Sequence, residues 1–335
     1  MSVFVQQSGT VCDFSGSDSW VILSPIEQSI KRKIEAVGTP LKDWDINIYR
    51  GVLTGCNEAF IISTEKRDEI LASCQSEDER KRTAELIRPI LRGRDIKRYG
   101  YEWANLYLIA TFPARHYDIA KYPAVKKYLL SFAYDYLLAN GNEWVANSYL
   151  SEFCRQKLAQ TGQYITINGK YILDDKGNRE KSRKKTSNKW FETQDSISYW
   201  EDFSKPKVMW KIIGCNINFS FDDNAMVCNN AVDIMTGKRE HLLQYIGIMN
   251  SKLYDWYLKL TTEAEVQGGG IQLYVTTLEK TLVKLDFPNS LNVIIEQRIN
   301  GLVSDEIADA AIFNAFGLTI EEIDAINNSK RIKRQ

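Results

Sequence analysis

Apolar residues recur along this chain at two spacings, and each spacing predicts a different kind of element. Isoleucines four residues apart share one helical face shortly after Ser24; they are Ile26, Ile30 and Ile34. Ser24 followed by Pro25 is typical of a helix start, and Glu27 stands where a capping box requires it. Gly38 is expected to end this helix.

Further along the chain, strand and helix patterns alternate without an internal repeat. Short runs rich in β-branched and aromatic residues predict strands at 46–51, 59–63, 107–112, 207–213 and 225–234. Apolar residues at helical spacing predict helices at 77–87, 123–136, 143–159 and 241–260. Pro89 is expected to end the helix at 77–87. The last 45 residues are expected to be helical, with a capping box at Thr319 and Glu322. Leu318 and Ile323 are placed as its hydrophobic staple.

The clearest local signal is a β-hairpin. Two β-rich arms at 164–167 and 170–173 flank Asn168-Gly169, the dipeptide typical of a type I′ turn. The following segment 178–189 contains six Lys/Arg and no large apolar residue, which predicts an exposed basic arm.

Together these elements predict an α+β fold. We expect a mixed-sheet lobe with an inserted hairpin and basic arm at about 160–187, followed by an α-helical tail. The expected division is a linker or leader at 1–19, a recognition domain at 20–288 and a C-terminal helical region at 289–335.

Composition narrows the class of protein. The chain has 335 residues, 44% of them hydrophobic and 26% charged, as in globular proteins with a sizeable core. Its net charge is zero, which argues weakly against nucleic-acid binding, because the distribution of charge matters more than the total. Six scattered Cys and only two His argue against a zinc site and fit a reducing cytoplasm. No apolar run is long enough to cross a membrane.

The sequence lacks the motifs of several catalytic sites. An amino-methyltransferase needs an Asn/Asp-Pro-Pro-Tyr/Phe pocket and a glycine turn for S-adenosylmethionine, but the seven prolines here are isolated. Two triplets, Asp95-Ile96-Lys97 and Asp174-Asp175-Lys176, match the short end of a metal-dependent nuclease motif. Such triplets are more often salt-bridged or solvated charges. We therefore predict that this chain is non-catalytic.

Cations and small polar residues are candidates for a surface that binds DNA. Arg and Lys contact phosphates, and Arg can also hold guanine through two hydrogen bonds. Thr54 and Asn57 lie in a polar loop between two strands, where Asn is able to pair with adenine. The candidate DNA-binding residues are Thr54, Asn57, Arg88, Arg92, Arg94, Lys97, Arg98, Arg183, Lys184 and Lys185.

From spacing alone, other interpretations of these residues stay open. The Thr54–Asn57 loop also fits a turn in which the side chains bond the backbone. The cations around Gly93 also fit a solvated turn with local ion pairs, for example to Asp95. The basic arm also fits a mobile segment with nonspecific phosphate attraction.

Several segments, in order along the chain, resemble one known family. They are Trp20-Val21-Ile22-Leu23-Ser24, 40–44, 50–62, 90–99, 190–192 with 203–208, Ile248-Met249-Asn250-Ser251-Lys252-Leu253, 282–288 and 313–323. In this order the segments resemble the TaqI-like target-recognition (specificity) region of adenine-N6 DNA methyltransferases and type IIG restriction-modification enzymes. The hairpin and basic arm have no counterpart with a role in that family.

The resemblance implies a function and a set of partners. A chain of this family selects a duplex DNA sequence for a methyltransferase, and sometimes an endonuclease, that is fused or bound to it. It implies that S-adenosylmethionine is held by that methyltransferase domain, with no cofactor on this chain. The expected setting is the cytoplasm, without a membrane partner. We expect the chain to be a fragment or a separate subunit, because the catalytic motifs are missing.

Two other functions remain alternatives at this stage. The aromatic-rich composition also fits a protein-interaction or structural subunit. One of the Asp-x-Lys triplets also allows a metal-dependent nuclease. Salt-dependent DNA binding separates the first function from the second, and divalent-dependent cleavage separates the nuclease from both.

We predict that the purified chain alone transfers no methyl group from S-adenosylmethionine to DNA, because the motifs for cofactor and target base are missing. The measurement is incorporation of a labelled methyl group into duplex DNA, with a preparation from cells lacking the gene as the control. Incorporation above that control contradicts the prediction.

Overall fold

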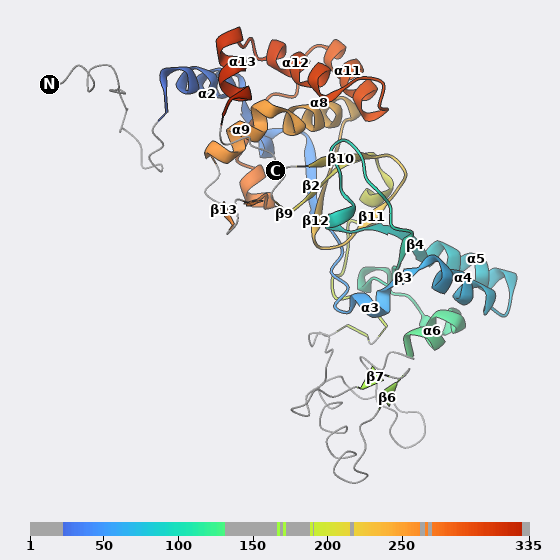
Figure 1. The fold of residues 1–335 in the computed structure, drawn as a ribbon. Helices are drawn as coiled ribbons and strands as arrows, with labels where there is room; N and C mark the ends of the chain where they lie inside the picture. The colour runs from blue at the N-terminus through green and yellow to red at the C-terminus, as the bar shows by residue number, and fades with distance from the viewer. Residues whose placement is uncertain are drawn as a thin grey trace, which may run out of the picture.

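A four-stranded antiparallel sheet with the strand order β10-β8-β12-β2 stands at the centre of the molecule (Figure 1). Its strands are β2 (Ile46–Arg50), β8 (Lys207–Lys211), β10 (Phe219–Asp222) and β12 (Val232–Gly237). The computed structural model describes residues 23–130, 166–167, 170–171, 188–189, 191–214, 218–261, 265–266 and 270–329. Because strand residues alternate between faces, each face of this sheet carries its own apolar set and covers its own core.

Helices cover one face of the central sheet. Val208, Trp210 and Met235 on this face are fully buried and pack into a core with the helices. The helices above the sheet in Figure 1 are α2 (Pro25–Val37), α8 (Arg239–Asn250), α9 (Lys252–Thr261), α11 (Asn289–Ile299), α12 (Asp305–Ala315) and α13 (Ile320–Asn327). The C-terminal helices therefore share one hydrophobic core with the sheet.

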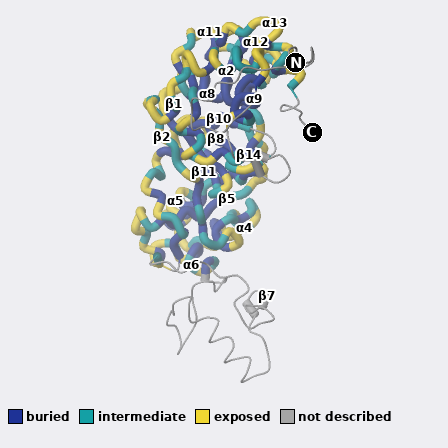
Figure 2. Tube along the Cα trace, turned by 90° about the vertical axis from the view of Figure 1, so that its left-hand side faces the viewer, coloured by how far each residue is buried: buried dark blue, intermediate teal, exposed yellow. Residues whose placement is uncertain are grey.

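A second sheet lies against the opposite face. Met209 and Ile234 on that face pack into a second core with residues of this sheet and of its helices. The strand order is β11-β4-β5-β3, with β3 (Ile61–Ser63), β4 (Ile87–Leu91), β5 (Leu106–Ile109) and β11 (Val227–Cys228). Its outer layer is α3 (Asn57–Phe60), α4 (Thr64–Ala72), α5 (Glu77–Leu86) and α6 (Pro123–Leu130). Figure 2 shows buried residues following the axis through both layers.

The remaining elements are short. Two-stranded pairs form between β1 (Thr39–Pro40) and β15 (Leu282–Val283) and between β6 (Thr166–Ile167) and β7 (Lys170–Tyr171). A three-stranded sheet joins β13 (Glu265–Val266), β14 (Gly270–Gln272) and β9 (Ile213–Gly214). A short helix, α10, spans Val275–Leu278, and single 3-10 turns are η1 (Leu41–Asp43), η2 (Gly93–Asp95), η3 (Pro113–Arg115), η4 (Ile119–Lys121) and η6 (Trp200–Ser204).

The structure confirms the α+β class and much of the local signal. Ser24 caps α2 with Glu27 in a capping box, and Thr319 caps α13 with Glu322 in the same way. Strands β6 and β7 pair across Asn168-Gly169, as the hairpin signal predicted. The predicted helix at 143–159 and the basic arm at 178–187 lie outside the described residues. None of the described helices is both long and apolar enough to cross a membrane.

Four predicted elements differ from the structure. Residues 57–60 form α3, so the strand expected from residue 59 begins only at Ile61. Helix α5 ends at Leu86, and Pro89 lies inside β4. The strand expected at 225–234 is split by a turn into β11 and β12, and the long helix at 241–260 is broken at Ser251.

The break at Ser251 has a tertiary cause. The carboxamide of Asn250 binds the backbone of Phe219 in both directions, with N–O distances of 2.9 and 2.8 Å. Ser251 then starts α9, since its hydroxyl accepts a hydrogen bond from Tyr254 N at 3.2 Å. Asp309 on α12 accepts a hydrogen bond from Lys252 N at 3.0 Å. This joint therefore holds the sheet, α9 and α12 together, and a continuous helix would lose it.

A buried ion pair anchors the start of the central sheet. Lys207 and Asp222 are fully buried and bond to each other across β8 and β10. The Lys207 ammonium also donates to Phe203 O at 2.6 Å. The Asp222 carboxylate accepts hydrogen bonds from Tyr101 OH at 3.0 Å and from Met226 N at 3.1 Å. Both charges are satisfied, which a buried pair needs in order not to be destabilising.

We predict that Lys207→Met lowers the free energy of unfolding by about 3–5 kcal/mol, because it leaves the Asp222 carboxylate buried without its cation. Chemical denaturation measures the loss. The matched control is Lys205→Met, which removes an exposed ammonium paired with Asp202 and is expected to have a much smaller effect. Equal losses in the two variants would contradict a special role for the buried pair.

Candidate nucleic-acid interface

Three strands of the two sheets end at one turn, Asn229–Val232. The turn is closed by a 2.9 Å hydrogen bond from its last N–H to its first carbonyl. At the end of β4, Leu91 O accepts a hydrogen bond from the first N–H of the turn at 3.0 Å. After β2, Gly51 N donates into the turn at 2.9 Å, and after β8, Ile212 N does so at 3.1 Å. The backbone of the turn is therefore held from three directions.

Two glycines allow this close approach. A Cβ on Gly51 would lie 2.1 Å from the carbonyl oxygen of Asn229, so no larger residue fits there. A Cβ on Gly93 would lie 3.3 Å from the Cβ of Ala231 and 3.4 Å from the Cγ of Lys211. These contacts bring the loop after β4 onto the turn and beside the end of β8.

Three cations stand where these strands end, with Arg50 on the helix-covered face of the central sheet and Lys211 on the opposite face. Arg50 ends β2, Lys211 ends β8, and Arg94 adjoins Gly93 in the loop after β4. Arg50 and Arg94 are exposed and Lys211 is half-buried. Among the described residues, none of the three makes a hydrogen bond or ion pair through its side chain. We call Arg50, Arg94, Lys211 and the turn Asn229–Val232 the basic edge.

A buried carboxyl group lies beneath the basic edge. Asp233 directly follows the turn and stands opposite Arg50 in the β12–β2 register. It is 2% exposed, and its Oδ1 has no hydrogen-bond partner among the described residues. Burial raises the pKa of Asp233 to about 7, and the nearby charge of Arg50 limits the rise. Asp233 therefore holds its proton to a higher pH than an ordinary carboxyl group does.

The structure gives Thr54 and Asn57 a local structural role. Thr54 is 1% exposed, and its hydroxyl donates to Asn57 Oδ1 at 2.7 Å. The same hydroxyl accepts a hydrogen bond from Cys56 N at 3.2 Å. This is the backbone-bonded turn that the spacing also allowed. Asn57 is exposed, but its carboxamide oxygen is occupied.

The cations around Gly93 separate into paired and unpaired groups. Arg92 binds Asp95 through two side-chain hydrogen bonds of 3.0 and 2.8 Å. Lys97 is exposed and lies 3.1 Å from Glu102. Arg88 is half-buried and lies over the ring of Trp200. Of this group, Arg94 alone is both exposed and without an ion pair among the described residues.

Arg98 points away from the other cations, toward the C-terminal helices. Its side chain is 12% exposed and bonds to Asp305 and to the carbonyl of Asn250. Asp309 lies 3.5 Å away from the same guanidinium group. Arg98 thus belongs to the joint between α8, α9 and α12. The structure does not place it on an exposed surface with Arg92 and Arg94.

The remaining predicted cations, Arg183, Lys184 and Lys185, lie outside the described residues. Sequence reasoning missed Arg50, Lys211 and the turn at Asn229. A signal existed: each of the two cations lies near the end of a predicted strand, and Asn229-Asn230 is a turn dipeptide inside a predicted strand. Only the tertiary contacts show that these positions meet.

The first triplet considered for a metal-dependent nuclease, 95–97, is engaged in ion pairs. Asp95 is 4% exposed, and both of its carboxylate oxygens bind Arg92, while Lys97 faces Glu102. The second triplet, 174–176, lies outside the described residues. Within the part of the chain that the structure describes, no group of three or more His, Cys, Asp or Glu side chains is arranged to hold a metal ion.

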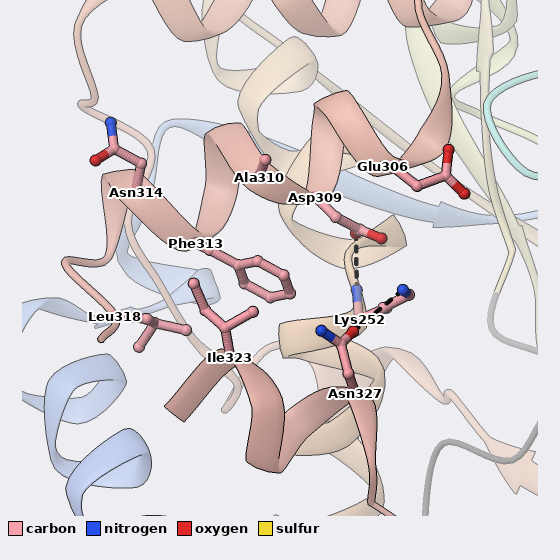
Figure 3. Close-up of a pocket in the computed structure, with 9 residues that line it drawn as sticks. All are labelled: Lys252, Glu306, Asp309, Ala310, Phe313, Asn314, Leu318, Ile323 and Asn327. Carbon is pink, nitrogen blue, oxygen red and sulfur yellow. Dashed lines mark hydrogen bonds between the residues drawn. The ribbon is translucent and has the colours of Figure 1, made fainter. Parts of the chain in front are cut away.

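A separate pocket of about 350 Å³ lies among the C-terminal helices (Figure 3). Phe313, Leu318 and Ile323 form its apolar side, and Lys252 stands at its polar side. The Lys252 ammonium already lies 3.2 Å from Asn327 Oδ1, and its backbone N–H binds Asp309. The polar groups of this pocket hold the helices together, and it lies apart from the basic edge.

The sequence matches the family model of the TaqI-like C-terminal specificity domain over residues 88–281, which is more than half of the chain. The match includes β4, the loop with Gly93, the buried ion pair and the turn Asn229–Val232. The chain belongs to this family of specificity domains. No curated protein sequence matches it.

Two solved restriction enzymes match this chain, and the first of them is similar in fold. The type IIG restriction endonuclease BpuSI has a TM-score of 0.51 at 12% identity, over 90% of this chain and 32% of the enzyme. The type IIL restriction-modification enzyme MmeI, solved in complex with DNA, has a TM-score of 0.46 at 10% identity, over 86% of this chain and 35% of the enzyme. The present chain spans about a third of the length of each.

We predict that Asp233→Asn stabilises the protein increasingly as pH rises from 5 to 8. Because the folded pKa is about 7 and the ordinary value 3.8, the folded state retains a proton that the unfolded state has lost between these values. Wild-type stability from this group therefore falls as pH rises through that window. The three-unit difference sets an upper bound of about 4 kcal/mol.

The measurement is the melting temperature of wild type and variant at pH 5 and pH 8. Asn adds its own unsatisfied amide, which shifts both values equally. The difference between variant and wild type is therefore the informative quantity. A difference that stays constant between pH 5 and pH 8 would show that Asp233 is ionised throughout.

Proposed function

We propose that this chain recognises duplex DNA for a restriction-modification system and that its basic edge contacts the phosphate backbone. The observation that carries the proposal is the group of three cations, Arg50, Arg94 and Lys211, without ion-pair partners among the described residues, at one rigid turn of a TaqI-like specificity domain. Cations at strand ends held by a fixed backbone are suited to a repetitive charged ligand.

The arrangement of charge supports DNA as the ligand although the net charge is zero. Arg92, Arg98 and Lys207 form ion pairs with buried or half-buried carboxylates inside the protein. The cations of the basic edge remain available to displace counterions from phosphates. Phosphate contacts fix the position of a protein on DNA, while contacts to base edges select the sequence.

We further propose that a methyltransferase, and in some systems an endonuclease, acts together with this chain. The supporting observations are the family and the fraction of each restriction enzyme, about one third, that the chain spans. S-adenosylmethionine would bind the methyltransferase part. Residues 20–288 would form the recognition unit, and the helical region 289–335 would support it through the shared core.

A protein-interaction role is the second candidate. The C-terminal region exposes Leu302, between α11 and α12, and Ile320, at the start of α13; their accessibilities are 73% and 75%. Large exposed apolar side chains are common at docking surfaces, although single ones also occur on ordinary surfaces. Binding to DNA that weakens with salt favours the first candidate, since an apolar docking surface does not respond in this way.

We predict that the triple variant Arg50→Ala, Arg94→Ala, Lys211→Ala binds duplex DNA more weakly and with a flatter salt dependence. Each phosphate contact contributes roughly 0.9 to the slope of log affinity against log salt, so three contacts contribute about 2.7. Fluorescence anisotropy with a labelled duplex between 50 and 300 mM salt, roughly the range in which this dependence is steep, measures both quantities.

The matched control removes three exposed cations elsewhere: Arg32→Ala, Lys42→Ala, Arg239→Ala. Lys42 precedes β2 and Arg239 follows β12, so both lie at the opposite ends of strands that reach the basic edge. The net charge changes equally in the two triple variants. If the control loses as much affinity as the basic-edge variant, the attraction is nonspecific and the proposed site is wrong.

A further inference from the structure

The tip of the turn carries one polar side chain that forms no hydrogen bond within the described residues. Asn230 is the second residue of the turn Asn229–Val232, and its backbone N–H donates to Val52 O at 2.9 Å. Its side chain is half-buried and makes no hydrogen bond within the described residues. The backbone at this position is thus fixed while the carboxamide is unassigned.

The other asparagines near the basic edge differ from Asn230 in this respect. The carboxamide oxygen of Asn229 accepts a hydrogen bond from Ala231 N at 3.3 Å and so stabilises the turn. The carboxamide oxygen of Asn57 accepts the hydroxyl hydrogen of Thr54. A carboxamide needs both its oxygen and its nitrogen to read a base edge in a bidentate manner. Asn230 keeps both.

The position of Asn230 relative to the cations is also fixed. The neighbouring Ala231 lies against Gly93, next to Arg94, and its carbonyl accepts the hydrogen bond from Ile212, next to Lys211. Gly51, next to Arg50, bonds the last residue of the turn. Lys211 and Arg94 therefore adjoin the turn on one side, and Arg50 stands beside its last residue on the other face of the central sheet.

We infer that Asn230 is a specificity-determining residue that reads one adenine through its carboxamide. The oxygen accepts from adenine N6, and the nitrogen donates to adenine N7 in the major groove. Lys211 and Arg94 hold the backbone, and the hydrogen-bonded turn presents the amide, so the ordering cost of the contact is low. This inference rests on the proposed function and names the base contact at the same site.

The test compares base preferences of the full chain and its variants. Wild-type protein and Asn230→Ala are each used to select duplexes from a randomised DNA library at low salt, and the enriched sequences are determined. We expect the variant to lose preference for adenine at one position, by about 5- to 150-fold, with the other positions unchanged. The salt slope should stay the same, because a base contact releases no counterion.

A second variant, Asn230→Asp, replaces the amide donor by an acceptor. Carboxylates accept from the cytosine N4 amino group, so the preference at that same position should change from adenine to cytosine. A gain of a new preference does not follow from a damaged fold. Asn314→Ala, at an exposed site on α12, is the control that should leave every position unchanged. The melting temperatures of all variants should match that of the wild type.

The outcomes separate the two levels of the argument. If wild type enriches no sequence and shows no salt-dependent binding, the proposed function itself fails. If wild type enriches a sequence and both Asn230 variants enrich the same one, the inference fails and the function stands. If Asn230→Ala lowers affinity for all sequences equally and flattens the salt slope, Asn230 acts only beside the phosphates, and the inference is likewise overturned.

Discussion

The close approach of Gly51 to the turn Asn229–Val232 is the constraint on which the rest of the structure depends. A side chain on Gly51 would overlap the carbonyl of Asn229, so only glycine lets the end of β2 reach the turn. This turn also forms hydrogen bonds with the strand ends of both sheets. The central sheet separates two hydrophobic cores, one shared with the C-terminal helices and one shared with the second sheet. Because the turn bonds strands of both sheets, it fixes these two parts of the fold relative to each other. The same backbone contacts bring the strand ends that carry Arg50 and Lys211, and the loop that carries Arg94, to one turn. Architecture and candidate interface therefore have one physical origin.

Strand β8 illustrates how location decides the role of a charge. Lys207 at its start is fully buried and satisfied by Asp222 and a carbonyl, whereas Lys211 at its end reaches the surface without a carboxylate. The cations near Gly93 divide in the same way, since Arg92 and Arg98 are held by Asp95 and Asp305 while Arg94 is not. A cation that left its buried carboxylate would leave an unpaired anion in the protein interior, which is strongly destabilising. Density of cations along the sequence is consequently a poor guide to a binding surface, and the absence of a nearby carboxylate is a better one.

Local signals in the sequence predicted what local interactions determine. The capping boxes at Ser24 and Thr319 and the pairing across Asn168-Gly169 need only neighbouring residues, and the structure confirms them. The breaks at Asn229 and Ser251 depend on partners far along the chain, such as Leu91 and Phe219. For that reason apolar periodicity alone predicted continuous elements there. The candidate site was predicted only at Arg94, because Arg50, Lys211 and Asn230 become neighbours through the fold.

The segments that resemble the family turn out to contain the joints of this fold. Gly51 and Gly93 permit the approach to the turn, Lys207 holds the central sheet, and Asn250 connects α8 to β10. Each of these residues makes a contact inside the protein that leaves it unavailable to bind a ligand. The residues with unoccupied polar groups stand directly beside the joints: Arg50 before Gly51, Arg94 after Gly93, and Asn230 after Asn229. A rigid joint with a free neighbour lets the scaffold stay constant while the side chain that meets the ligand is exchanged. For a domain whose task is specificity, this separation of framework from contact residue is a physical advantage, because a new contact does not require a new fold.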